Sequence, residues 1–118
     1  MSLPEEANPS FELNDTQQML RRTVRELAER HIAPRAAEID EKEEYPEDIF
    51  QLLKAHQLLG VFFPENLGGG GMGFLGGCIV MEEIARFCSN SALLVLLTML
   101  PSRAIELCGS EEQKKHYL

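Results

Sequence analysis

Glu82 and Glu83 are the adjacent carboxylates whose type and position come nearest to acid–base chemistry. Paired carboxylates can share general acid–base work when their side chains face the same reacting group. Neighbouring residues on a helix point about 100° apart, however, so these two do not face each other. Arg86 follows at the spacing that forms ion pairs with either carboxylate. We therefore interpret the pair as structural and assign no catalytic residue.

A glycine run is the second chemical candidate, since seven of the nine glycines fall between Gly68 and Gly77. The run matches the G-x-G-x-x-G phosphate-binding pattern twice, in overlapping registers. A dinucleotide-binding fold also needs a buried strand before the run, which Pro64 interrupts. It further needs an acidic residue about 20 positions on, where Ser91 stands. The run therefore predicts a tight turn whose backbone packs close to neighbouring helices.

Cysteines and histidines show no metal-binding or disulfide spacing. The cysteine count is odd, no C-x-x-C pair exists, and the histidines are scattered singly. These residues are Cys78, Cys88, Cys108, His31, His56 and His116. We expect the thiols to be small buried hydrophobic groups in a reducing compartment.

Composition limits the partners of the chain. Its 118 residues carry 11 Lys and Arg against 19 Asp and Glu, a net charge of −8, and 44% are hydrophobic. That length supports one hydrophobic core. The negative charge disfavours nucleic acid and anionic lipid as partners. The acidic first residues, which lack a basic region followed by an apolar stretch, lead us to expect no secretory signal or transit peptide. The longest apolar run, near residues 92–100, is about half the length that a membrane span needs.

Local signals predict the helices that would position these groups. Asn14 with Gln17 forms a capping box, and apolar residues at helical spacing follow until Pro34, which ends or kinks the helix. Residues 35–48 are acidic without the ligand pattern of a calcium loop, and we expect a solvated connection with at most one short helix. Pro46 suits the first turn of the next helix. The inner stripe of that helix would be Ile49, Leu52, Leu53 and His56.

The second half of the chain is more apolar. Residues 74–86 predict a helix buried between neighbours, because it is apolar almost all round. Another helix over 92–100 would be interrupted or kinked by Pro101. Ser110 with Gln113 forms a second capping box, so a last helix begins there.

These elements predict an all-α fold, a helical bundle of about five to six helices over residues 12–118, after a flexible arm at residues 1–11. A short helix that begins at Ser110 needs tertiary packing, and little chain follows it. We therefore expect the sequence to be part of a longer protein.

Leucines at helical spacing give the most apolar helix face of the chain. These are Leu93, Leu96, Leu97 and Leu100. Such a stripe is typical of a core. Two successive helices that are apolar on most faces exceed what a small bundle needs, so the surplus face could also line a pocket or dock on another domain.

Three ordered segments resemble the acyl-CoA dehydrogenase family. FPENLGG at 63–69 is similar to its Pro-Glu-x-Tyr-Gly-Gly turn, and MEEIAR at 81–86 to its Glu-Glu-Leu/Ile-Ala-Arg helix. GSEEQKKHYL at 109–118 resembles its Gly-Thr/Ser-x-Glu-Gln-Lys-x-x-Tyr-Leu segment. The resemblance runs from about residue 12 to residue 118.

This resemblance implies an N-terminal helical domain of a flavin-dependent acyl-CoA dehydrogenase, truncated before the β domain. The parent would dehydrogenate an acyl-CoA thioester between its α and β carbons, pass electrons through FAD to an electron-transfer flavoprotein, and form a homo-oligomer, a tetramer in the family. We expect it in the cytoplasm of a bacterium or the mitochondrial matrix of a eukaryote. The FAD and the catalytic base belong to other domains, so this chain alone would hold no FAD and would be inactive.

The resemblance also implies where an acyl chain would lie. Wall residues of the acyl pocket follow the Glu-Glu-Ile-Ala-Arg helix, and on this sequence they are Ala92, Leu93, Leu96, Leu97 and Leu100. Gln57 stands where the family commonly has a helix-ending glycine, so we expect either a left-handed backbone at Gln57 or a different turn there. The alternative function is a free-standing helical interaction module that binds a partner through its leucine-rich face.

Overall fold

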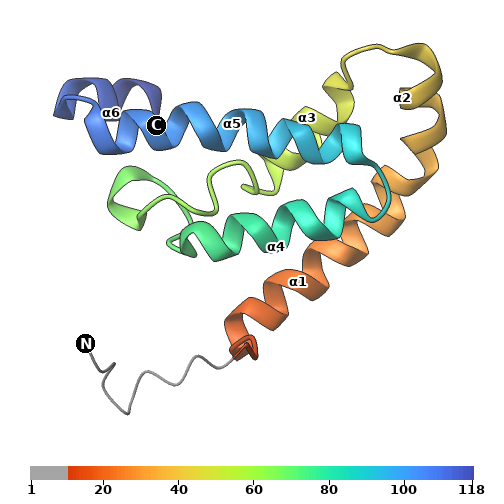
Figure 1. Ribbon diagram of the computed structural model, residues 1–118, viewed down its shortest axis with the longest axis horizontal. Coiled ribbons are helices and arrows are strands. Elements are labelled where there is room, and N and C mark those ends of the chain that lie inside the picture. The colour runs from red at the N-terminus through yellow and green to blue at the C-terminus, as the bar shows by residue number, and fades with distance from the viewer. Residues whose placement is uncertain (1–10) are drawn as a thin grey trace, which may run out of the picture.

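The computed structural model describes residues 11–118, which form an all-α fold (Figure 1). Within these residues there are six α-helices and no strand. The helices are α1 Asp15–Leu27, α2 Ala36–Lys42, α3 Glu47–Ala55, α4 Gly73–Ala85, α5 Ser89–Cys108 and α6 Glu111–Tyr117. The predicted bundle of five to six helices is confirmed. The predicted arm lies outside the described residues except for Phe11, which is 95% exposed.

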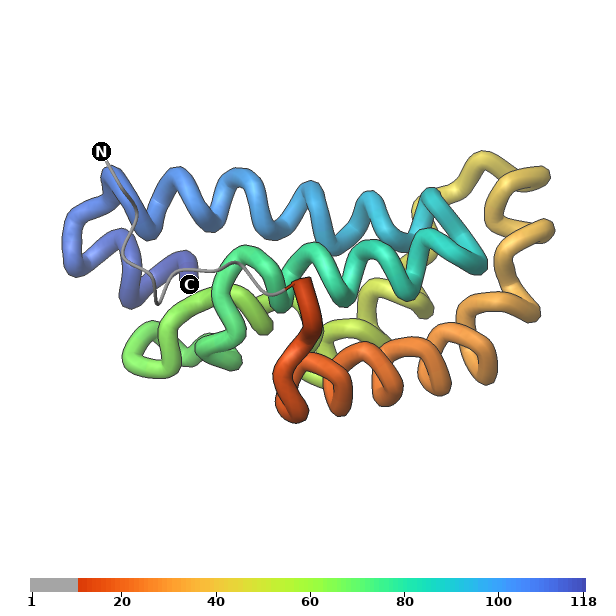
Figure 2. The backbone as a smooth tube through the Cα atoms, turned by 60° about the horizontal axis from the view of Figure 1, so that its bottom comes forward, coloured from red at the N-terminus to blue at the C-terminus, as the bar shows by residue number. Residues whose placement is uncertain are grey.

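Helices α4 and α5 lie side by side with opposite directions, and α1 crosses beneath α4 (Figures 1 and 2). The main core fills the space between these three helices. Val24 of α1, Val80 and Ile84 of α4, and Val95 of α5 are completely buried there. A smaller cluster, which we call the Phe–Met cluster, consists of buried Phe62, Phe63 and Met99.

The predicted helix starts are confirmed in atomic detail. In α1 the backbone N–H of Gln17 donates to the side-chain Oδ1 of Asn14 at 2.8 Å, and the backbone N–H of Asn14 donates to the side-chain Oε1 of Gln17 at 3.0 Å. The same reciprocal pair joins Ser110 and Gln113 at the start of α6. Each box satisfies backbone donors that have no partner inside the helix, so these starts are encoded locally.

Pro34 changes the helix geometry as predicted. After α1 the backbone continues as a π-helical turn over Ala28–Ile32 and a 3-10 turn over Ala33–Arg35. Pro34 has no N–H and its ring crowds the preceding turn, so a regular α-helical ladder cannot pass it. Gln57 has a φ of 58°, which confirms the first of the two alternatives expected there, a left-handed backbone.

Pro101 does not interrupt its helix, so the predicted interruption is wrong, whereas the alternative of a kink stays a prediction. Helix α5 runs without a break for 20 residues and has Pro101 inside it. Its length and apolar composition alone would allow it to cross a membrane, which corrects the shorter length read from the sequence. This is weak evidence for a span, because a core helix passes the same test, and α5 packs along α4.

Several side chains expected in the core lie at the surface instead. His56 is exposed, although its spacing predicts the inner stripe of α3. Cys108 is exposed and Cys78 is half-buried, so only Cys88 fits the prediction of a buried thiol. Phe74 at the start of α4 is also exposed. Helical spacing predicts which side chains share a face of a helix, but it does not show which part of that face neighbouring elements bury.

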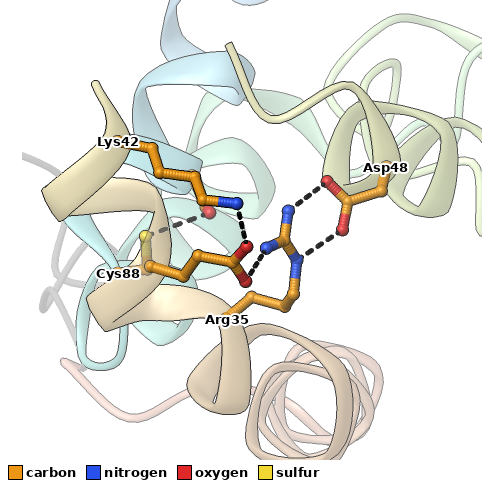
Figure 3. Close-up of polar contacts among 6 residues, drawn as sticks. Arg35, Lys42, Asp48 and Cys88 are labelled. Atoms are coloured by element: carbon orange, nitrogen blue, oxygen red, sulfur yellow. Dashed lines mark hydrogen bonds and ion pairs between the residues drawn. The ribbon is translucent and has the colours of Figure 1, made fainter. Parts of the chain in front are cut away.

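The acidic connection is held by ion pairs (Figure 3). Nε and Nη2 of Arg35 donate to the two oxygens of Asp48 at 2.8 and 2.9 Å, and Arg35 also bonds Glu38. Lys42 donates to Glu38 at 2.7 Å. The guanidinium thus joins α2 to α3. Both the pKa of Glu38 and the pKa of Asp48 are lowered, in each case first by hydrogen bonds from these cations.

Candidate functional site

The candidate site is an uncovered apolar strip along α5. Leu93, Leu97 and Leu100 are 46%, 64% and 53% exposed, and they lie at intervals of four and three residues. Residues at these intervals share one face of a helix. We call this strip the leucine face. Side chains of this kind are normally buried, and a contiguous exposed group of them marks an interaction or ligand-binding surface.

The structure divides the five predicted wall residues into two groups. Leu93, Leu97 and Leu100 form the leucine face. Ala92 is buried in the main core instead. Leu96 is half-buried and packs against the Phe–Met cluster. Leu96 therefore lies at the edge between the uncovered strip and the interior, and the role of all five as a pocket wall stays a prediction.

Two glycines allow close packing around α5. A Cβ placed on Gly77 would lie 2.7 Å from Sδ of Met99, so the bare backbone of α4 makes room for this α5 side chain. A Cβ on Gly69 would lie 2.2 Å from Cβ of Phe63, within the turn that precedes α4. This confirms the prediction that the glycine run packs closely against its neighbours.

The glycine turn is not built to hold a phosphate. Its amide groups already donate to carbonyl oxygens of the same turn: Gly68 to Glu65, Gly69 to Pro64, Gly70 to Gly60. A phosphate loop needs such N–H groups free and converging on the ligand. The sequence interpretation of this segment as a structural turn agrees with these bonds.

A cavity of about 330 Å³ separates the glycine turn from the second half of α5. Its lining includes the aromatic side chains Phe62 and Phe74 and, at α5, the ion pair Arg103–Glu106. Nη1 of Arg103 donates to Glu106 at 2.7 Å, so its guanidinium is already partly neutralised. The cavity lies one turn of α5 beyond Leu100.

Glu83 is a structural anchor between α1 and α4. Its side chain is only 1% exposed, and its carboxylate accepts hydrogen bonds from Arg21 at 3.1 Å and from Arg25 at 2.9 and 3.1 Å. Arg86 lies 3.8 Å away. The hydrogen bond from Arg25 is the main cause that lowers the pKa of Glu83, against the opposing effect of burial. A carboxylate with a lowered pKa, whose oxygens already accept hydrogen bonds from arginines, is a weak base.

Sequence reasoning missed two of these partners. The pattern of α1 places Arg21 and Arg25 on its solvent face, and the spacing of Arg86 predicts it as the main partner of the carboxylates. A usable signal was present, since Arg21 and Arg25 lie four positions apart and therefore share one face of α1. Glu82 is exposed while Glu83 is buried, which confirms that the two carboxylates do not face each other.

Two of the cavities do not suit the diphosphate group of FAD. FAD carries a negatively charged diphosphate. A cavity of about 490 Å³ beside the acidic connection is lined by three carboxylates, those of Asp40, Glu43 and Glu44, which would repel it. A cavity of about 280 Å³ beside the glycine turn offers Lys54, but the turn amides there are occupied. We therefore assign no flavin contact to these residues.

Comparison with known proteins gives a consistent result. The family described as "Acyl-CoA dehydrogenase, N-terminal domain" matches residues 14–118. Probable acyl-CoA dehydrogenase FadE25 of Mycobacterium tuberculosis is 40% identical over 114 residues, which cover 94% of this chain and 29% of that protein. Mitochondrial short-chain specific acyl-CoA dehydrogenase of Sus scrofa is 36% identical over 110 residues, with 92% and 27% covered.

A third relative has a name that describes a different reaction. The 3-sulfinopropanoyl-CoA desulfinase of Paraburkholderia xenovorans is 36% identical over 106 residues, covering 89% of this chain and 27% of that protein. The chain therefore spans less than a third of the length of each of these relatives.

Proposed function

Because this chain belongs to the acyl-CoA dehydrogenase family as its N-terminal helical domain, we propose that the leucine face of α5 forms one wall of the acyl pocket in a flavin-dependent acyl-CoA dehydrogenase. The single observation that carries the proposal is the row of half-exposed leucines Leu93, Leu97 and Leu100 on a helix whose opposite side is buried. An acyl chain is an apolar ligand that such a surface binds by excluding water.

The chemical step belongs to the rest of the parent protein. That reaction removes one hydrogen from the α carbon and one from the β carbon of the thioester, and the bound FAD accepts the electrons. We assign the catalytic base to neither Glu82 nor Glu83, since Glu83 is paired with arginines and Glu82 points away from Glu83. We propose that the isolated chain holds no FAD and has no activity. We also propose that the parent protein passes its electrons to an electron-transfer flavoprotein and that it forms a homo-oligomer.

The test is a substitution on the leucine face of the full-length protein. Leu97→Trp adds bulk at an exposed position, so it should fill pocket space without disturbing the core. We expect the ratio of kcat/KM for long-chain to short-chain acyl-CoA substrates to fall about tenfold or more, the range that a change in pocket size produces. Met19→Trp, at a similarly exposed residue of α1, is the matched control and should leave the ratio unchanged.

Two results would contradict the proposal. If Leu97→Trp and the unsubstituted protein have the same ratio of kcat/KM for long-chain to short-chain substrates, the leucine face is not a wall of the acyl pocket. A folded full-length protein that takes up no FAD, measured by the flavin absorbance of the purified protein, would favour the interaction-module alternative.

A further inference from the structure

Gly77 of α4 and Met99 of α5 form a close contact between these two helices. Sδ of Met99 lies 2.7 Å, and Cβ of Phe62 3.7 Å, from the point where a Cβ of Gly77 would be. Met99 itself is 1% exposed. The thioether of Met99 therefore occupies the volume that any side chain at residue 77 would need. A larger residue 77 and the present Met99 side chain cannot both fit there.

That shared space has few ways to expand. Phe62 and Phe63 are buried on one side of Met99, and a packed interior does not absorb added volume without movement. Leu96 packs against the same cluster, lies one helical turn before Met99, and is half-exposed. Met99 has a flexible side chain, so its tip can move when crowded. Leu96 is the neighbour of this cluster that also borders the leucine face.

We propose that Gly77 and Met99 are positioning residues that set how far Leu96 and the leucine face project, and thereby the length of acyl chain that the pocket accepts. The inference rests on the proposed function of α5 as a pocket wall. Added bulk at residue 77 moves the wall outward and shortens the accepted chain. A shorter side chain at residue 99 restores the space.

The experiment compares Gly77→Ala, Met99→Leu and the double variant in the full-length protein. Leucine is close to methionine in volume but has a shorter reach, so it preserves the core while making room for the alanine methyl group. We expect Gly77→Ala to lower the long-to-short ratio of kcat/KM about tenfold. The double variant should return the ratio to that of the unsubstituted protein. Glu82→Ala, at an exposed residue of the same helix, is the control and should leave the ratio unchanged.

The outcomes separate this inference from the function on which it rests. If Leu97→Trp shifts the ratio and Gly77→Ala does not, the positioning role is overturned while the pocket wall stands. A purely structural role would lower kcat/KM for all chain lengths by the same factor, and it would also overturn the inference. Failure of Gly77→Ala to fold would show that Met99 cannot yield, with the same consequence. A protein that oxidises no acyl-CoA would overturn both proposals.

Discussion

Glu83 combines a negative charge with burial in the interior of the domain. Its carboxylate is almost completely buried, whereas its partners Arg21 and Arg25 keep about half and a third of their side chains exposed. The charge is therefore satisfied by guanidinium groups that remain hydrated at their outer edge. This arrangement avoids most of the desolvation that makes fully buried ion pairs unfavourable.

Substitution of Glu83 should weaken the domain in a pH-dependent way. We expect Glu83→Gln to lower the free energy of unfolding by about 1.5–3 kcal/mol near neutral pH, the range for hydrogen bonds to a charged group. Because the folded-state pKa of Glu83 is lowered, its contribution is present above the ordinary glutamate pKa and disappears as the pH falls through the lowered value. Denaturant unfolding of both proteins across this pH range provides the measurement. Glu82→Gln is the exposed control, and a pH-independent difference would contradict the account.

Helix α5 is the element on which the proposed site depends. Proline in a helix interior leaves the carbonyl four residues earlier without its usual partner, here that of Leu97 in the leucine face. The helix nevertheless continues to Cys108. Packing against α4 therefore outweighs the local preference of Pro101, which is a tertiary effect.

Replacement of Pro101 should stabilise α5. Alanine restores the missing N–H and has a helix propensity about 3 kcal/mol more favourable than that of proline. We expect Pro101→Ala to raise the free energy of unfolding by up to that amount, measured by denaturant titration. Ser102→Ala, the neighbouring control, should change it by only about 0.5 kcal/mol. Loss of stability in Pro101→Ala would mean that the packing of α5 requires the proline geometry.

Sequence-based prediction succeeded for features that residues close together in the sequence determine. Capping boxes located the starts of α1 and α6, because each depends on residues three positions apart. It failed where the cause is distant: Arg25 reaches Glu83 across 58 positions, and α5 passes Pro101 because of its neighbours. For the candidate site, helical spacing identified the leucines as a group. Only the packing showed that Ala92 is buried while Leu97 is exposed.

The part of the chain that the structure describes is flat and extended. Its principal extents are 52 × 37 × 23 Å, and its radius of gyration is 16.0 Å. A compact domain of this length would have a radius of about 13–14 Å. A thin molecule covers less of its apolar surface, and the leucine face is part of what remains uncovered.

The isolated chain should therefore self-associate at high concentration. Apolar patches left open to water favour contact between copies. We expect the average mass measured by light scattering to rise with concentration, and to rise less for Leu97→Lys. Met19→Lys, which adds the same charge at a similarly exposed residue away from α5, should behave like the unsubstituted chain. A constant monomer mass at all concentrations would refute the prediction.

The long-range bonds between α1 and Glu83 have a consequence for biosynthesis. A ribosome that adds about 5–20 residues per second needs roughly 3–12 s to travel the 58 positions from Arg25 to Glu83. During that interval α1 has been synthesised but its anchor has not, so the apolar side of the nascent helix faces solvent. Chaperones that recognise such segments would have their longest opportunity to bind there, before the second half of the domain emerges.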